Sequence, residues 1–216
     1  MKIKHICFDL DGTIVKSDKT IYKATLSTLR HLNIKGDIPE QKFNKMIGLH
    51  FVDIFNELNL DVPNFEKFID IYKNIYFDFI DDSKLYNNVV DVLLSLKNDK
   101  DIKLSLLTTK GQDQAEKIIK HFNLNKHFDL IMGRRDGIAH KPSAEPLLFI
   151  CNELEVDAKN TLMVGDTELD ILCGKNAGTI TCGVTYGYRT EESLKENNPD
   201  YLVNDFGEII FLLRKT

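Results

Sequence analysis

Residues 3–13, with the sequence IKHICFDLDGT, predict a buried strand that ends in two carboxylates. Residues i and i+2 of an extended backbone face the same way, so Asp9 and Asp11 can point into one cavity. Two carboxylates this close repel each other, and such pairs persist where a metal ion or a shared proton needs them. Gly12 then permits a sharp turn. The alternative interpretation is a strand end followed by acidic turn residues.

A helical region follows this first strand. From about residue 20 to residue 79 the apolar side chains recur at helical spacing, and no strand-like alternation interrupts them. Pro39 and Pro63 lie where helices could begin. We therefore expect residues 18–81 to form an all-helical domain inserted after the first strand.

The remainder of the chain alternates between helix and strand. The pattern predicts strands over 103–107, 128–132, 161–164, 180–184 and 201–203, and helices over 89–97, 112–122, 143–154, 169–176 and the end of the chain. Apolar strands separated by helices are typical of a parallel sheet that helices cover on both faces. The expected fold is α/β, a doubly wound parallel sheet made of residues 1–17 and 82–216.

Composition and charge disfavour several classes of protein. The chain has 216 residues, 43% of them hydrophobic, and a net charge of −5, which favours a folded domain over a nucleic-acid-binding one. No apolar stretch approaches the roughly 18 residues that span a membrane, and the acidic cluster begins too early for a removable signal segment. Four cysteines without paired metal-ligand spacing indicate reduced, buried thiols. We expect a cytoplasmic protein, a monomer or a weak homodimer.

The acidic residues gather at the carboxyl ends of predicted strands, where open parallel sheets bind ligands. Asp9, Asp11 and Asp166 together can supply the oxygen ligands that Mg²⁺ prefers. Asp170 would contribute through a bridging water. Thr167 and Asp170 also fit a helix capping box, which explains Asp170 but leaves Asp166, on the strand tip, without a structural task.

Lys141 and Thr108 complete a site suited to phosphoryl transfer. Pro142 suits the first position of a helix, which would place Lys141 at the positive end of the helix dipole and so favour an anion beside it. Taken alone, Thr108 is better explained as a helix-capping hydroxyl. A carboxylate can attack phosphorus while a metal, a cation and hydroxyl donors stabilise the transferred group. In this scheme Asp9 is the nucleophile, and Asp11 protonates the leaving alcohol and then activates water.

These clusters resemble the four motifs of the haloacid dehalogenase-like superfamily. Residues 9–13 match its Asp-x-Asp-Gly-Thr motif, Thr108 its second-motif hydroxyl, Lys141 its third-motif lysine, and residues 165–170 its Gly-Asp-x-x-x-Asp motif. The resemblance runs almost end to end, because the helical insertion is similar to a cap domain at the first cap position. It implies a Rossmann-like core that carries the cap.

The resemblance also implies roles for the acidic residues. Asp9 would be both nucleophile and metal ligand, and Asp11 would be the acid/base, with its backbone carbonyl on the metal. Asp166 would be a metal ligand, and the cofactor would be Mg²⁺. The proton donor Asp11 argues against dehalogenation, since the dehalogenases of the family attack carbon and lack that group.

Within the superfamily, residues 141–146 and 176–188 resemble phosphoglycolate phosphatases and related pyrophosphatases. The sequence departs from their pattern at Thr109, where these enzymes often carry Asn, at Lys16, and at Asn87-Asn88, where Pro-Gly is common. None of these departures removes a catalytic group. The resemblance implies a Mg²⁺-dependent phosphatase that hydrolyses a small, phosphoglycolate-like metabolite, with Thr109 among the substrate contacts.

Substrate choice should lie in the cap, which closes over such sites and expels water. Residues 47–50 are its one segment with turn-like chemistry, and we expect Lys45 and His50 beside it to contact the leaving group. A plain helix–helix turn with solvated polar residues is the alternative. Arg30 is the only arginine of the cap, which favours a compact substrate.

Several other functions remain compatible with the sequence. A pyrophosphatase, a sugar-phosphate phosphatase and a β-phosphoglucomutase-like phosphomutase would use the same motifs. A non-catalytic phosphoacceptor domain would also carry an acidic cluster with a strand-end threonine and a lysine, but it would not need a 60-residue insertion after its first strand.

Overall fold

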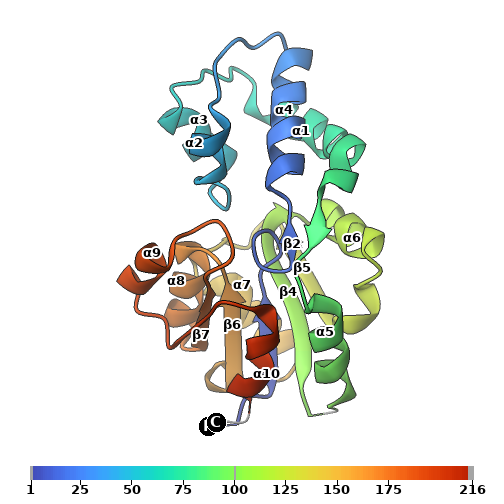
Figure 1. The fold of residues 1–216 in the computed structure, drawn as a ribbon, viewed down its shortest axis with the longest axis vertical. Helices are drawn as coiled ribbons and strands as arrows, with labels where there is room; N and C mark the ends of the chain where they lie inside the picture. Colours follow the sequence, from blue (N-terminus) through green and yellow to red (C-terminus); the bar gives the residue numbers. More distant parts are fainter. Residues whose placement is uncertain (1, 100, 214–216) are drawn as a thin grey trace. The chain divides into compact units, whose positions relative to one another are not determined.

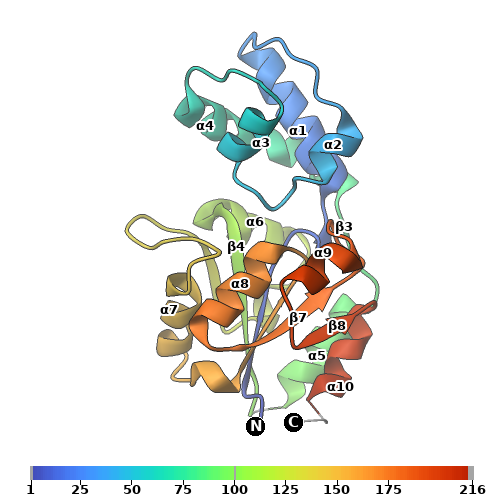
Figure 2. The same ribbon diagram turned by 90° about the vertical axis from the view of Figure 1, so that its left-hand side faces the viewer.

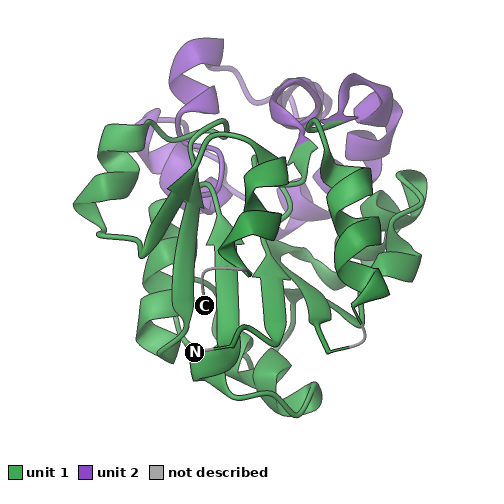
Figure 3. Cartoon of the chain, turned by 60° about the horizontal axis from the view of Figure 1, so that its bottom comes forward, with its two compact units in different colours: residues 1–15, 85–216 green, residues 16–84 purple. Residues whose placement is uncertain are grey.

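The computed structural model describes residues 2–99 and 101–213, which divide into two compact units (Figure 3). Unit 1 takes in the described residues up to Val15 and from Leu85 onward, and unit 2 is Lys16–Lys84. The chain passes between the units in two short strands, Val15–Lys16 (β2) and Lys84–Leu85 (β3). These strands pair as a two-stranded sheet, which the sequence pattern did not predict because two residues are too few to show alternation.

Unit 1 is built on a six-stranded sheet with the strand order β5-β4-β1-β6-β7-β8 (Figure 1). Its neighbouring strands pair in parallel. The strands are His5–Phe8 (β1), Lys103–Gly111 (β4), Leu130–Arg134 (β5), Thr161–Gly165 (β6), Ile180–Val184 (β7) and Tyr201–Val203 (β8). The predicted fold class, an α/β fold with a parallel sheet, is confirmed.

Alternate residues of β1 pack on opposite faces of this sheet. Cys7 belongs to a buried cluster with Leu147 and Ile150 of α7 and Cys173 of α8. Phe8 stacks instead on Phe206, with 5.3 Å between ring centroids. Helices α7 and α8 therefore lie on one side of the sheet and α5 and α10 on the other (Figure 2).

The helices of unit 1 are Val89–Asn98 (α5), Gln112–His121 (α6), Glu145–Glu153 (α7), Glu168–Ala177 (α8), Glu191–Glu196 (α9) and Ile209–Leu212 (α10), with 3-10 turns at Asn125–His127, Ala158–Asn160 and Phe206–Glu208.

Two elements of unit 1 differ from their predicted bounds in ways that affect the site. Strand β4 continues past the predicted end at residue 107 to Gly111, with a shift of register against β5. Helix α7 begins at Glu145, so Lys141 and Pro142 lie in the loop before it, and Pro146 occupies its first turn. The expectation that Lys141 lies at the helix N-terminus was therefore wrong, and the carboxylates described below hold it instead.

Unit 2 is helical between its two short strand ends, as expected of the insertion. Its segments are Asp18–His31 (α1), Glu40–Asn44 (α2), Phe51–Glu57 (α3), Phe65–Ile75 (α4) and the 3-10 helix Tyr76–Asp82. Aromatic rings form its core: Phe51 and Tyr72 lie 4.7 Å apart between centroids, and Phe55 and Phe68 lie 4.9 Å apart. The apolar periodicity of the sequence thus reflects packing within this unit.

The order of the sheet fixes where a ligand can bind. Successive connections run outward in opposite directions from β1, which lies between β4 and β6. Ligands of open parallel sheets bind beyond the carboxyl ends of the strands at such a reversal.

All four cysteines are buried and unbridged, as predicted. Among the described helices, none has the length and apolar character needed to cross a membrane.

Candidate active site

The loop after β1 brings its two carboxylates to the reversal point of the sheet. The Asp9 backbone N–H donates to the Val164 carbonyl of β6 at 2.9 Å, which continues the strand pairing by one residue. Gly12 follows at φ 88°, and a Cβ at this position would collide with the Asp166 carboxylate. Gly12 is therefore required both by the left-handed backbone and by the close approach of a site residue.

Asp166 lies fully buried at the end of β6 and is held from two directions. Thr13 donates its hydroxyl to Oδ1 at 3.3 Å, and the backbone N–H of Tyr188 donates to Oδ2 at 2.8 Å. Thr13 and Tyr188 both lie in stretches that carry the family resemblance, but their contacts with Asp166 were not predicted, since each depends on a loop folding back over the strand end. A buried carboxylate with only two donors has capacity for a further cationic partner.

Lys141 joins two of the acidic residues. Its ammonium donates to Asp9 Oδ1 at 2.6 Å, to Asp170 Oδ1 at 2.6 Å and to the Leu107 carbonyl at 3.1 Å. These three bonds use all its donors, and its side chain is only 3% exposed. The anion partner that the sequence predicted for Lys141 is thus a pair of protein carboxylates.

Asp170 has both of its oxygens engaged in the first turn of α8. While Oδ1 accepts from Lys141, Oδ2 accepts from the Thr167 backbone N–H at 3.0 Å and from the Thr167 hydroxyl at 2.7 Å. The capping box expected from the sequence is present. Asp170 therefore caps the N-terminus of α8 and contacts Lys141 at the same time.

The buried acidic cluster changes the ionisation of its members. Burial raises the pKa of Asp9 to about 7, although Lys141 opposes the shift, and Asp170 and Asp11 add to it. Burial, with Asp9 and Asp170 nearby, also raises the pKa of Asp166 well above its usual range. Burial would lower the pKa of Lys141, but Asp170 and Asp9 outweigh it and raise that pKa. One ammonium does not balance this many carboxylates, so the cluster favours a further cation.

A metal ion fits this cluster by both chemistry and geometry. Asp9, Asp166 and Asp170 each offer an oxygen, and these oxygens lie within 4.8 Å of one another. Carboxylate oxygens are the ligands that hard divalent cations prefer. The Asp11 side chain is not part of this group of three. The arrangement of the three carboxylates can therefore hold a divalent cation.

Asp11 contacts a residue that the sequence analysis did not single out. Lys110 lies on the extended part of β4, and its ammonium is 3.1 Å from Asp11 Oδ2, with both side chains about nine-tenths buried. Lys110 can reach Asp11 because β4 continues to Gly111, beyond the strand end at residue 107 that the sequence predicted. Lys110 therefore brings a second cation to the acidic residues.

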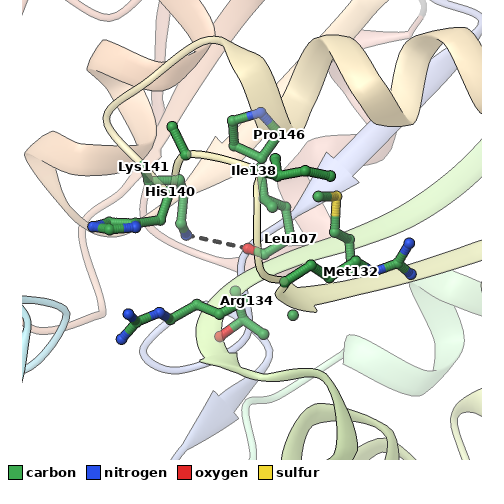
Figure 4. A pocket seen from close by; sticks show the side chains of 11 residues that line it. Leu107, Met132, Arg134, Ile138, His140, Lys141 and Pro146 are labelled. Carbon is green, nitrogen blue, oxygen red and sulfur yellow. Dashed lines mark hydrogen bonds between the residues drawn. The ribbon is translucent and has the colours of Figure 1, made fainter.

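Thr108 and Lys141 line a small pocket beside this cluster, together with Arg134 and His140 (Figure 4). The pocket has room for about one water molecule. Thr108 is buried, and its hydroxyl accepts from the Lys110 backbone N–H at 3.3 Å. Thr109 is half-buried in the next position of β4. The Thr108 hydroxyl can still donate its proton to a ligand, because its contact with Lys110 uses it only as an acceptor.

The two residues expected to contact the leaving group lie in unit 2. Lys45 follows the end of α2 and is exposed, while His50 precedes α3 and is half-buried. Lys45 comes two residues before the segment 47–50, and His50 is the last residue of that segment. Their contact with a substrate stays a prediction.

Comparison with known proteins places this arrangement in a family. A family model described as haloacid dehalogenase-like hydrolase matches residues 6–184. A protein of Clostridium perfringens assigned as pyrophosphatase PpaX is 35% identical over 99% of this chain and 98% of its own. Pyrophosphatase PpaX of Halalkalibacterium halodurans is 32% identical over 97% of this chain and 96% of its own.

Solved structures agree with the sequence comparison. A protein of Haemophilus somnus assigned as a phosphoglycolate phosphatase superimposes with a TM-score of 0.83 at 25% identity, covering 98% of each chain. A protein of Clostridium difficile assigned as a phosphatase gives 0.82 at 27% identity, covering 99% of each chain. The four motifs, the parallel core and the helical insertion have the same explanation: the chain belongs to the haloacid dehalogenase-like hydrolases and is a hydrolase of the phosphatase type.

Proposed function

We propose that the protein hydrolyses a small phosphorylated metabolite with Mg²⁺ as cofactor and an aspartyl-phosphate as intermediate. The observation that carries this proposal is the buried contact of Lys141 with both Asp9 and Asp170, next to Asp166. It holds a carboxylate in one orientation at the ligand-binding edge of the sheet. It also leaves excess negative charge where a divalent cation would bind.

In the first step, an oxygen of Asp9 attacks the phosphorus atom and the bond from phosphorus to the leaving oxygen breaks. Asp11 gives a proton to that oxygen, so the leaving group departs uncharged at this atom. The proposed role of Asp11 is supported by its position two residues from Asp9 on the same loop and by its burial, since its side chain is only 11% exposed. Its pairing with Lys110 holds the carboxylate in place.

In the second step, water attacks the phosphorus of the aspartyl-phosphate. Asp11 takes the proton from the water, and the bond from phosphorus to Asp9 breaks, which regenerates the carboxylate and releases phosphate. Lys141 and Thr108 stabilise the charge on the transferred oxygens. Lys141 contacts Asp9 and lines one pocket with Thr108, and both side chains are buried.

Mg²⁺ is the cation that we propose for the three-carboxylate group. Asp9 and Asp166 would hold it directly. Asp170, whose two oxygens already accept hydrogen bonds, would act through water. When bound, Mg²⁺ supplies positive charge to the phosphoryl oxygens.

Two substrates deserve the first test. Phosphoglycolate follows from the motif resemblance and from the name of the Haemophilus somnus structure. Pyrophosphate is favoured by the names of two relatives that match this chain over nearly its whole length. Both are compact, as expected of a cap with one arginine.

The decisive experiment measures phosphate release from pyrophosphate, phosphoglycolate, sugar phosphates and phenyl phosphate, with Mg²⁺ and with EDTA. Asp9→Asn should lose about 10³-fold or more in kcat, because the nucleophile is gone. Asp157→Asn, an exposed aspartate paired with Lys159, is the matched control and should keep wild-type activity. The wild type and Asp9→Asn are each mixed briefly with a substrate labelled in its phosphoryl group, and the reaction is stopped with acid. The wild-type protein should then carry the label, and Asp9→Asn should not.

Three outcomes would contradict the proposal. They are equal turnover in EDTA, retained turnover in Asp9→Asn, and absence of turnover on the whole panel by a folded protein. A requirement for a bisphosphorylated sugar activator would indicate a phosphomutase instead. A stable phospho-Asp9 without steady turnover would indicate a phosphoacceptor domain.

A further inference from the structure

The loop between β5 and α7 places basic side chains next to the proposed catalytic residues. Arg134 is the last residue of β5, and it lines the same pocket as Thr108 and Lys141. In Figure 4 its side chain extends to the side of the pocket on which those of His140 and Lys141 lie. The proposed mechanism uses Thr108 and Lys141 but gives no role to Arg134.

The neighbouring arginines of this loop differ in their partners. Arg135 donates from Nε to Gln112 Oε1 at 3.2 Å, and its guanidinium lies 5.6 Å from the centroid of the Phe149 ring. The Arg134 side chain is exposed and has no hydrogen bond or ion pair with any residue in 2–99 or 101–213. Arg135 is thus held by the protein, whereas the charge of Arg134 remains available to a ligand.

The balance of charges at the site indicates which kind of ligand group Arg134 would bind. Arg189, whose charge acts on Asp166, is neutralised by its ion pair with Glu168. The remaining acidic and basic groups around the proposed nucleophile are Asp9, Asp11, Asp166, Asp170, Lys110 and Lys141. Their four carboxylates exceed their two ammonium groups by two charges, which one divalent cation would neutralise. A substrate with a second anionic group, beyond the transferred phosphoryl group, therefore needs a cation from elsewhere. A guanidinium suits this purpose, since it binds carboxylate or phosphate through paired hydrogen bonds.

We propose that Arg134 binds a second oxyanion on the leaving group, so that the enzyme selects substrates whose leaving group is itself anionic. The inference rests on the proposed phosphatase function and narrows its substrate class. A carboxylate, as in phosphoglycolate, and a phosphate, as in pyrophosphate, offer the same oxyanion chemistry. Phenyl phosphate, whose leaving group is uncharged, offers none.

The first test compares kcat/KM of Arg134→Gln with that of the wild type on these three compounds. We expect a fall of about 10- to 100-fold for pyrophosphate or phosphoglycolate, mainly through KM, and a change of less than about threefold for phenyl phosphate. Arg134→Lys should recover part of the loss. Arg135→Gln removes the adjacent guanidinium and should not discriminate between the three substrates.

The comparison between pyrophosphate and phosphoglycolate identifies which oxyanion Arg134 binds. A selective fall for pyrophosphate assigns a phosphate to Arg134, and a selective fall for phosphoglycolate assigns a carboxylate. An equal fall on phenyl phosphate would overturn the inference, because Arg134 would then act on the transferred group. No fall on any substrate would overturn it as well.

A binding measurement separates this inference from the proposed function. Calorimetry with Asp9→Asn and with Asp9→Asn/Arg134→Gln, in Mg²⁺, measures the affinity for pyrophosphate and phosphoglycolate without turnover. We expect about tenfold weaker binding when Arg134 is replaced. If the wild type hydrolyses nothing yet this difference appears, the catalytic proposal fails and the oxyanion site stands. Equal affinities would refute the oxyanion site alone.

Discussion

The strands β1, β4 and β6 carry buried polar groups near both of their ends, and the two sets differ in charge. Near the amino ends, the His5 imidazole lies between two hydroxyls, with Nδ1 3.1 Å from Thr161 Oγ1 and Nε2 2.7 Å from Ser105 Oγ. At the carboxyl ends, Asp9 and Asp166 lie with Lys141 in the candidate active site. The same sheet thus buries a neutral set and a charged one.

The ionisation of the two sets shows what this difference means. Burial lowers the pKa of His5 to about 4, so the imidazole is neutral near pH 7 and both of its nitrogens have a partner. Burial raises the pKa of Asp9 to about 7; Lys141 opposes this shift, and Asp170 and Asp11 add to it. A polar set whose groups all have partners within the protein stabilises the fold, whereas a set with more carboxylates than ammonium groups is suited to binding a further cation.

Removal of the Lys141 ammonium should have the largest effect. Lys141→Gln leaves Asp9 and Asp170 buried without their cation, so we expect a loss of about 3–5 kcal/mol in the free energy of unfolding in EDTA. Turnover should also fall strongly. Urea unfolding measures the first effect, and addition of Mg²⁺ should restore part of the stability.

The matched control is Lys159→Gln, which removes an exposed lysine paired with Asp157. That variant should unfold like the wild type, because exposed ion pairs contribute little. If Lys141→Gln were as stable as the wild type in EDTA, the charged end of the sheet would not depend on an internal cation. The contrast between the two ends would then fail.

The neutral end should produce a pH dependence of stability with a definite sign. The unfolded chain binds a proton at His5 below about pH 6.5, whereas the folded chain does so only near pH 4. Stability is therefore lost as the pH falls from about 6.5 to 4, by about 3 kcal/mol at most. Urea unfolding of the wild type and of His5→Gln at several pH values in this window measures the difference in slope.

His121→Gln, at the end of α6, is the control for a histidine on the surface and should keep the wild-type slope. Turnover of His5→Gln near pH 7 should stay close to that of the wild type. Identical slopes for wild type and His5→Gln would show that the imidazole is not buried in its neutral form.

The smallest expected effect comes from single hydroxyls. Ser105→Ala leaves a ring nitrogen of His5 without its partner, which should cost about 1–3 kcal/mol of stability with little change in kcat. Thr13→Val removes the donor to Asp166 and should act mainly on kcat. If each variant altered stability and turnover equally, the division between a structural end and a catalytic end would be wrong.

Much of the catalytic region could be predicted from the sequence because it follows strand ends. Asp9 and Asp166 each come directly after an apolar run, and parallel strands bring such positions to one edge. The periodicity also identified the parallel core and the helical insertion. These features depend on local pattern, which a sequence displays directly.

Contacts that depend on loop geometry could not be predicted in the same way. The three-way contact of Lys141 requires the chain after β5 to return over the sheet before α7, and no periodicity encodes that path. Lys110 meets Asp11 only because β4 continues beyond residue 107. That the Arg134 side chain lines the pocket without an ion pair to any of the described residues is a property of the assembled fold.

The pairing of β2 with β3 also affects how the chain can reach its fold. His5 of β1 pairs with Lys103 of β4, about a hundred residues further along, so closing this contact in an open chain orders a long loop. Most of that loop is Lys16–Lys84, a compact unit whose two ends leave it in adjacent strands. If this unit folds first, the effective loop shortens roughly threefold, and the entropic cost of bringing β1 to β4 falls by about 1 kcal/mol. The inserted helices would then hold the chain ends that lead to β1 and β4 close together, and the sheet that carries Asp9 would form faster.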